Sequence, residues 1–425
     1  MTIYFVAGEV SADNHGAALM RSLRELEPRV QFIGRGGPQM QQVAGERFKN
    51  WIGDAAVLGL WEVVRKYGYF REQFHLTLNE IRANKPDTVV LIDYPGFNLR
   101  LAHALRRQSP QQKIVYYISP QVWAWNRGRI KRMAGCIDLV LCIFPFEADL
   151  YNESGLRAVF VGHPMIERLE ARKIDVERDP NLIGLFPGSR PREVRKIFPI
   201  MIETARVLLK ARPNLHFQVA AASEELADEM SKVLAPRLKP VPLGMGDERL
   251  PAPANESPPF SSSRGEGRVR DAPSQGRRVI EVTVGQTAEI MQRARTGIVA
   301  SGSATLEAAY FRMPFVLIYK VAWPTYLAGR LVVKVKYLGM PNLLAGKEAV
   351  PEFIQHRAQP VVMAKAVRPF IEDARAREQM ISEFDAVIAK LGDRGADKRA
   401  ARAIVEELRE ARPPDRPGGL KIAAP

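Results

Sequence analysis

Short apolar runs alternate with amphipathic helical patterns along most of this 425-residue chain. Strands that alternate with helices form parallel sheets, because each crossover helix returns the chain to the same end of the sheet. We therefore predict an α/β fold built on parallel sheets. Ligands bind beyond the carboxyl ends of such strands, so the loops there are the candidate sites. The predicted strands are Ile3 to Val6, Thr88 to Ile92, Ile114 to Ile118, Leu139 to Ile143, Ile183 to Phe186, His216 to Ala220 and Gly297 to Ala300.

The length of the chain divides these strands into two sets, because a chain of this size exceeds one ordinary core. A polar stretch, KIDVERDPN, precedes the strand at Ile183 and marks the boundary. We predict an N-terminal domain at 1–170, a C-terminal domain at 171–390 with a disordered Pro-, Ser- and Gly-rich insertion at 250–278, a helix at 391–412 that packs back on the first domain, and a flexible tail at 413–425.

Charge and cysteine content narrow the partners and the compartment. The formal net charge of +15 predicts an anionic partner, which could be nucleic acid, a phosphorylated substrate or an anionic membrane face. The two cysteines, Cys136 and Cys142, lie in an apolar stretch and are too far apart for a CxxC pair, which favours buried thiols in a reducing compartment. The sequence has neither about eighteen consecutive apolar residues nor a signal-peptide pattern at its start, so we expect a cytoplasmic protein.

Two strand-to-helix turns in the second half have features of phosphate binding. The first contains Arg190 in a Gly-Ser-Arg turn, and the second contains the turn at 301–303 with Glu307 one helical turn later. Backbone N–H groups at a helix start can hold a diphosphate, and a carboxylate one turn along can accept ribose hydroxyls. Each turn could equally be structural, with Arg190 on the surface, Ser303 as a helix cap and Glu307 in solvent. Neither turn is a Walker loop.

Carboxylates follow two predicted strands of the first half. Glu9, Asp13 and His15 crowd the loop after the first strand, and Asp93 comes directly after the strand that ends at Ile92. Acids in such loops commonly cap the next helix or turn. A carboxylate at the carboxyl end of a strand can also act as a general base. The residues alone leave both roles open.

Two segments interleave aromatic with basic side chains. In residues 116–134, Trp123 and Trp125 precede several basic side chains. This pattern is typical either of a site that binds single-stranded nucleic acid or, as we favour, of a Trp-lined domain interface. Residues 57–76 fit either core packing or an interfacial contact that sinks apolar side chains into lipid headgroups beside cationic anchors. The candidate membrane or acyl-chain contacts there are Leu60, Trp61, Val64, Arg65, Lys66, Tyr69 and Phe70.

Taken together, the motifs of both halves resemble the lipid-A-disaccharide synthase family, glycosyltransferase family 19 with a GT-B fold. The matching segments include AGEVSADNHGAALM, VLGLWEV, IDYPGFNLRLA, YYISPQVWAWNRGRI, FVGHP, LFPGSRPREV, SGSATLEAA and YLGMPNLLAGKEAVPEFIQ. The resemblance implies two Rossmann-like parallel-sheet domains facing a central cleft. It also implies an inverting transfer of 2,3-diacylglucosamine from its UDP derivative to 2,3-diacylglucosamine 1-phosphate (lipid X). The implied products are lipid A disaccharide 1-phosphate, an intermediate of lipopolysaccharide, and UDP.

The resemblance assigns roles to matching residues. Asp93 is the expected catalytic base, with Glu9, Asp13 and His15 as competitors. The expected UDP-donor residues are Arg190, Ser301, Gly302, Ser303, Glu307, Asn342, Lys347, Glu352 and Gln355, and the expected acceptor-side loop residues are Glu9, Ser11, Asp13 and Gly16. Neither a cofactor nor a metal is expected. The implied location is peripheral, at the cytoplasmic face of the inner membrane, without nucleic acid and with a homodimer left open.

This sequence departs from the family pattern at three of these motifs. Ala12 stands where the family usually has Gly, which matters if that position needs a positive φ or a close substrate approach. Lys347 replaces a common Arg, which keeps the charge and loses the bidentate fork. Ser303 replaces a common Thr, which keeps the hydroxyl. The insertion at 250–278 has no counterpart in the family pattern.

There are two rival interpretations, one within the enzymes and one from another class of protein. One is a different UDP-sugar protein of GT-B fold, such as a peptidoglycan N-acetylglucosaminyltransferase or a UDP-GlcNAc epimerase. The Trp pair and the PEFIQ segment argue against it. The other is a non-catalytic lipid- or nucleic-acid-binding protein on the same fold. The joint presence of Arg190, Glu307, Asn342 and Gln355 argues against that.

Overall fold

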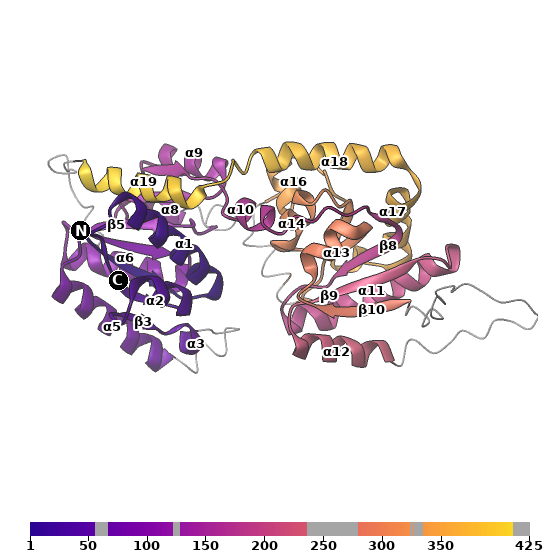
Figure 1. Cartoon of the computed structure of the whole chain (residues 1–425), viewed down its shortest axis with the longest axis horizontal. Coiled ribbons are helices and arrows are strands. Elements are labelled where there is room, and N and C mark those ends of the chain that lie inside the picture. Colours follow the sequence, from indigo (N-terminus) through magenta and orange to yellow (C-terminus); the bar gives the residue numbers. More distant parts are fainter. Residues whose placement is uncertain (56–66, 122–127, 236–278, 324–325, 327–334, 411–425) are drawn as a thin grey trace, which may run out of the picture.

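The computed structural model describes residues 1–55, 67–121, 128–235, 279–323, 326 and 335–410, which form two lobes (Figure 1). Each lobe contains one sheet, with strand order β3-β2-β1-β4-β5-β6-β7 in the first and β10-β9-β8-β11-β12-β13 in the second. Neighbouring strands run parallel in both sheets. The predicted α/β class with two parallel sheets is therefore confirmed.

The first lobe alternates strands and helices as the apolar runs predict. Its strands are β1 (Thr2–Ala7), β2 (Gln31–Gly36), β3 (Phe48–Asn50), β4 (Thr88–Ile92), β5 (Lys113–Tyr117), β6 (Leu139–Cys142) and β7 (Ala158–Phe160). Its helices are α1 (Val10–Leu26), α2 (Pro38–Ala44), α3 (Ile52–Ala55), α5 (Tyr67–Asn84), α6 (Pro95–Gln108), α8 (Gly128–Ala134) and α9 (Pro145–Glu153). The next helix, α10 (Met165–Glu170), follows β7 in the chain and packs on the core of the second lobe.

The second lobe repeats this arrangement. Its strands are β8 (Asp179–Phe186), β9 (His216–Ala221), β10 (Ile280–Val284), β11 (Ala294–Ala300), β12 (Phe315–Tyr319) and β13 (Glu352–Ile354). Its helices are α11 (Pro191–Ala211), α12 (Glu224–Leu234), α13 (Thr287–Arg293), α14 (Ala304–Tyr310), α16 (Met340–Ala345), the 3-10 turn η2 (Gln355–Arg357), α17 (Pro360–Glu372) and α18 (Ala374–Ala389).

Both faces of the first sheet are buried. Side chains alternate along β1, and each alternate set joins a different apolar cluster. Tyr4 and Val6 join one apolar cluster, while Ile3, Phe5 and Ala7 join another on the opposite face. The last helix, α19 (Ala396–Arg409), completes the second of these clusters with Ala400, Ala401, Ile404 and Val405. This helix comes from the C-terminal end of the chain and covers the first lobe (Figure 1).

The chain crosses between the lobes twice, and the two crossings are bonded to each other. The His163 N–H donates to the Leu391 carbonyl at 2.8 Å, and Arg399 Nε donates to the Val161 carbonyl at 2.8 Å. Gly162 has a φ of +87°, and a Cβ there would collide with the Arg399 guanidinium. The crossing therefore needs glycine both for its backbone angle and for space.

Several predicted features lie outside the described residues. They are the insertion at 250–278, the tail at 413–425, Trp123 and Trp125, and the candidate membrane contacts Leu60, Trp61, Val64, Arg65 and Lys66. Within the described part of the chain, none of the helices has the length and hydropathy needed to cross a bilayer.

Candidate active site

The carboxyl ends of β1 and β4 bring Glu9 and Asp93 to one edge of the first sheet. The two strands are neighbours, with Ala7 opposite Ile92, so the residues that follow them lie side by side. Glu9 is exposed at the start of α1, and its side chain makes no capping hydrogen bond there. The acid is therefore not the helix cap that its position suggests.

Asp93 has a backbone conformation that residues other than glycine rarely adopt. Its φ is +46°, and that of Tyr94 is +50°. The Asp93 N–H donates to the Tyr117 carbonyl at 3.0 Å, while its own carbonyl accepts from Asn98 Nδ2 at 2.8 Å and from the Tyr116 hydroxyl at 2.5 Å. Left-handed backbone costs about 1–2 kcal/mol at such residues, so these bonds must offset it. Strain of this kind concentrates at functional sites.

The pKa of the Asp93 carboxyl is raised to about 6, mainly by burial and then by the negative charge of Glu9, against a lowering by the Tyr94 N–H. Both main causes act by disfavouring the charged form. A carboxyl that titrates near 6 is ionised at neutral pH and still basic enough to take a proton from a hydroxyl. Its geometry and its pKa both suit the base predicted from sequence.

An aromatic wall stands beside these carboxylates, and the sequence reasoning did not select it. The Tyr94 ring lies over Gly8, where a Cβ would come within 2.5 Å of the ring. Trp51 meets the Tyr94 ring edge-on at 6.3 Å and donates from Nε1 to the Ala7 carbonyl at 2.6 Å. The available signal was the aromatic residue directly after Asp93. Trp51 is buried and supports the half-buried Tyr94 ring, which gives the site an apolar side of the kind that packs against a sugar ring.

Asp13 has a different role from Glu9. Its carboxylate is 2 % exposed and accepts from the backbone N–H groups of Gly37, Gln39 and Met40, each at 2.9 Å. These are the free N–H groups at the start of α2, so Asp13 caps a helix that begins 25 residues later in the chain. All these contacts are internal, whereas the sequence reasoning placed Asp13 facing the substrate.

The rest of the first loop is also occupied by packing. A Cβ on Gly16 would come within 2.5 Å of Met40 Sδ, so this glycine allows α1 to pack closely on α2. Ala12 lies in the first turn of α1 without a positive φ, and its methyl group joins the core. The backbone angle therefore tolerates Ala12. Ser11 is exposed.

His15 meets a second histidine, His163, which precedes α10. The pKa of His15 is lowered to about 4, mainly by burial and then by the positive charge of Arg168. The pKa of His163 is likewise lowered to about 3, mainly by burial and then by the charges of His15 and Arg168. His163 Nδ1 accepts from the Met165 N–H at 3.1 Å. Both rings are neutral at pH 7, and His15 is a much weaker base than Asp93.

The two predicted phosphate turns lie side by side in the second lobe. Strands β8 and β11 are neighbours, with Phe186 opposite Val299, and the turns follow directly. The Arg190 side chain is 72 % exposed and donates to Glu193 Oε1 at 3.1 Å. Its guanidinium therefore places an exposed positive charge at the start of α11. Gly188 and Gly302 have φ values of +102° and +152°, which glycine adopts without strain.

The second turn differs from expectation in its cap. Ser303 has helical backbone angles, φ −58° and ψ −30°, and its side chain makes no capping bond, because an N-cap acceptor needs an extended backbone. The Ser301 N–H donates to the Ile318 carbonyl at 3.0 Å. Glu307 lies one turn into α14, where its carboxylate accepts from Arg168 Nη2 at 2.8 Å. Its side chain is 13 % exposed and so retains access to solvent.

Asn342 and Glu352 build a network that shapes the edge of this lobe. The Glu352 carboxylate accepts from the N–H groups of Leu338 and Gly339 and from Asn342 Nδ2, at 3.1, 2.8 and 2.9 Å. Asn342 is fully buried and exchanges two hydrogen bonds of 2.7 Å with the backbone of Val350. These internal hydrogen bonds hold the loop that precedes α16 in place.

Gln355 and Lys347 are also engaged within the lobe. Gln355 is 3 % exposed and pairs with the backbone of Val321, accepting at Oε1 (2.9 Å) and donating from Nε2 (3.2 Å). Lys347 Nζ donates to Glu383 Oε1 on α18 at 2.7 Å. These side chains hold the second-lobe loops together.

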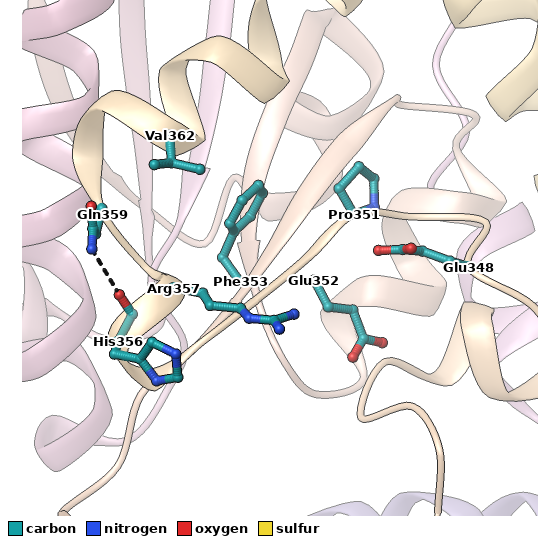
Figure 2. A pocket seen from close by; sticks show the side chains of 8 residues that line it. All are labelled: Glu348, Pro351, Glu352, Phe353, His356, Arg357, Gln359 and Val362. Atoms are coloured by element: carbon teal, nitrogen blue, oxygen red, sulfur yellow. Dashed lines mark hydrogen bonds between the residues drawn. The ribbon is translucent and has the colours of Figure 1, made fainter.

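A pocket opens at the carboxyl end of β13. Figure 2 shows Glu352, His356 and Arg357 around it, with Phe353 and Val362 on its apolar side. The sequence reasoning passed over His356 and Arg357, although they directly follow the PEFIQ segment. The full lining is Glu348, Pro351, Glu352, Phe353, His356, Arg357, Gln359 and Val362.

Tyr69 and Phe70 are the described members of the predicted membrane segment. Both are half-buried in α5, with their rings edge-on at 5.6 Å. Phe70 packs against the core of the first lobe. For Phe70, core packing therefore accounts for at least part of the apolar pattern.

Comparison with known proteins covers both lobes. The family model described as lipid-A-disaccharide synthetase matches residues 3–250 and 263–405. A lipid-A-disaccharide synthase of Geobacter sulfurreducens is 33% identical over 414 residues, which is 96% of this chain and 97% of the relative. The solved structures of S. aureus MnaA with UDP and of the calicheamicin glycosyltransferase CalG4 have TM-scores of 0.56 and 0.52. Their sequences are 13% and 14% identical to this chain. The matched regions cover 96% and 97% of this chain and 95% and 99% of the respective solved chains. The predicted GT-B fold is confirmed.

Proposed function

Because the chain belongs to the lipid-A-disaccharide synthase family, and is therefore a hexosyltransferase of lipid A biosynthesis, we propose that it joins UDP-2,3-diacylglucosamine to lipid X. The proposed products are lipid A disaccharide 1-phosphate and UDP. The match across both lobes favours this reaction over another UDP-sugar protein of the same fold. It also disfavours a non-catalytic lipid- or nucleic-acid-binding protein.

The observation that carries the proposal is the half-buried Asp93 beside Glu9 at the edge of the first sheet. In the proposed step, the Asp93 carboxylate takes the proton of the acceptor hydroxyl. The hydroxyl oxygen forms a bond to the anomeric carbon of the donor on the face opposite UDP. The bond from that carbon to the diphosphate oxygen breaks, and its electron pair leaves with UDP. The anomeric configuration is inverted.

The second lobe is proposed to bind the UDP part of the donor. The Arg190 guanidinium and the turn of Ser301, Gly302 and Ser303 lie on adjacent strand ends and can meet the negative charge that develops on the diphosphate. Glu307 is proposed to accept from the ribose. Asn342, Lys347, Glu352 and Gln355 are proposed to line the donor side by holding its loops in shape, since their side chains are engaged in internal bonds.

The proposed substrates explain the charge of the chain. Both are anionic lipids whose acyl chains rest in a membrane leaflet, so a strongly basic surface favours their approach. We propose a peripheral location at the cytoplasmic face of the inner membrane. The segment at 57–76, with its aromatic and basic side chains, is the proposed contact.

The test is a transfer assay with purified protein in detergent, given UDP-2,3-diacylglucosamine and lipid X in the presence of EDTA. We expect disaccharide and UDP in equal amounts. UDP release no higher than a buffer blank would overturn the proposal. UDP-N-acetylglucosamine in place of the acylated donor is the matched control, because turnover with it would indicate the rival UDP-sugar chemistry.

A further inference from the structure

Arg168 occupies the junction between the lobes. Its helix, α10, lies between them in Figure 1, and Met165, Ile166 and Leu169 of this helix belong to the core of the second lobe. The helix is therefore fixed to the second lobe, and Arg168 Nη2 reaches Glu307 Oε1 at 2.8 Å from this base. The two residues are 139 positions apart in the sequence.

A second polar contact holds the same pair of helices together. Glu170, two residues after Arg168, accepts from the Tyr310 hydroxyl of α14 and also pairs with Arg394 at 2.6 Å. The spacing between α10 and α14 is thus set independently of Arg168. The Arg168 guanidinium can therefore act on the direction of the Glu307 side chain without carrying the helix contact alone.

The surroundings of Arg168 leave its charge for Glu307. Among the described residues, His15 and His163 lie close enough to Arg168 for its charge to lower their pKa values, and burial keeps both rings neutral. A carboxylate has two oxygens, and the guanidinium engages Oε1. Oε2 of Glu307 is then the oxygen that can accept from a ligand, on a side chain that is 13 % exposed.

We propose that Arg168 is a positioning residue for the nucleotide, which turns the Glu307 carboxylate so that Oε2 accepts from the ribose hydroxyls of UDP. This inference rests on the proposed function, in which Glu307 binds the ribose. Its ligand is the diol of a nucleoside diphosphate. Arg168 itself touches neither the sugar that is transferred nor the reacting atoms.

The test measures binding of UDP and of 2′,3′-dideoxy-UDP to the full chain by titration calorimetry. For the unmodified protein we expect UDP to bind about tenfold more tightly than the dideoxy compound, because the carboxylate contact is lost with the hydroxyls. Arg168→Ala should reduce this preference to about twofold, and Arg168→Lys should restore part of it, since a point charge holds the carboxylate less rigidly. Arg394→Ala, which removes another ion pair of α10, is the matched control and should keep the full preference.

The outcomes separate the inference from its premise. An unchanged preference in Arg168→Ala, with a clear preference in the unmodified protein, overturns the positioning role alone. No preference in the unmodified protein overturns the Glu307 ribose contact, and the inference with it, whereas the transfer assay reports on the reaction separately. An equal loss of preference in Arg168→Ala and Arg394→Ala shows a general disturbance of α10 and also overturns the role of Arg168.

Discussion

The carboxylates of the two lobes have different surroundings. In the first lobe, Asp93 is half-buried beside a second acid, Glu9, and its pKa is raised to about 6. In the second lobe, Glu193, Glu307 and Glu352 each meet an N–H donor, from Arg190, Arg168 and the backbone before α16 respectively. The raised pKa of Asp93, caused first by burial and then by Glu9, suits this acid to take a proton, whereas an acid engaged by donors is positioned for binding. From this contrast we expect proton transfer in the first lobe and donor binding in the second.

The largest effect is expected at the first-lobe acid. Asp93→Asn removes the proton acceptor and keeps the shape, so kcat should fall about a thousandfold while the KM for the donor stays within about twofold. Steady-state kinetics with both acylated substrates measure this. A fall in kcat of less than tenfold would move the base to another residue and remove the contrast between the lobes.

Stability provides the control for that variant. The folded pKa of Asp93 lies above the ordinary value of 3.8, so its charged form is disfavoured in the folded state. This penalty develops as pH rises from about 4 to 6 and is fully present above 6. Asp93→Asn should therefore unfold at no lower a temperature than the unmodified protein at pH 7.5. Lost activity with a lowered midpoint would indicate misfolding instead.

Asp13 is a first-lobe acid that is engaged by donors, as the second-lobe acids are, because three backbone N–H groups hold it. Asp13→Ala should lower the free energy of unfolding by about 3 kcal/mol, since the start of α2 loses its acceptor. Chemical denaturation measures the change. Ser11→Ala, on an exposed residue of the same helix turn, is the control and should change stability by less than about 0.5 kcal/mol. A loss of activity in Asp13→Ala without a loss of stability would return Asp13 to the candidate bases.

The second-lobe counterpart is Glu307, where a binding effect is expected. Glu307→Gln weakens both the Arg168 contact and the proposed ribose contact, so the KM for the UDP donor should rise about tenfold while kcat falls less than about threefold. Initial rates over a range of donor concentrations measure both constants. Equal effects on kcat and KM, or a kcat loss like that of Asp93→Asn, would contradict the division between the lobes.

The sequence predicts those strands and candidate residues that a local pattern marks. The strands of both sheet centres are continuous apolar runs, and Asp93 is recognisable because an acid directly follows one of them. The three-residue strand β13 carries no such pattern, since it pairs on one side and is only partly buried. Edge strands of this kind are stabilised by their neighbours rather than by their own residues.

Partners that are distant in the sequence explain the rest. Nothing near Asp13 shows that its acceptors serve N–H groups at residues 37–40, and nothing near Glu307 shows that Arg168 will reach it. The sheet order brings these groups together, and a single sequence contains no record of such pairs. Local pattern therefore points to candidate residues, but it does not show that the contacts of one of them, Asp13, are internal.

The smallest expected effect tests the acid pair itself. The kcat/KM of the unmodified protein should rise with pH through about 6 and level off above it, because Asp93 acts as a base only when deprotonated. Glu9→Gln removes the neighbouring charge but leaves the burial, which is the larger cause of the raised pKa. The midpoint of the acid limb should therefore move to lower pH by less than one unit, with little change in the plateau. Glu193→Gln, in the second lobe, should leave the midpoint in place. If the midpoint of the acid limb stays unchanged in Glu9→Gln, burial alone sets the pKa of Asp93. Proton transfer would then need only one of the two acids of the first lobe.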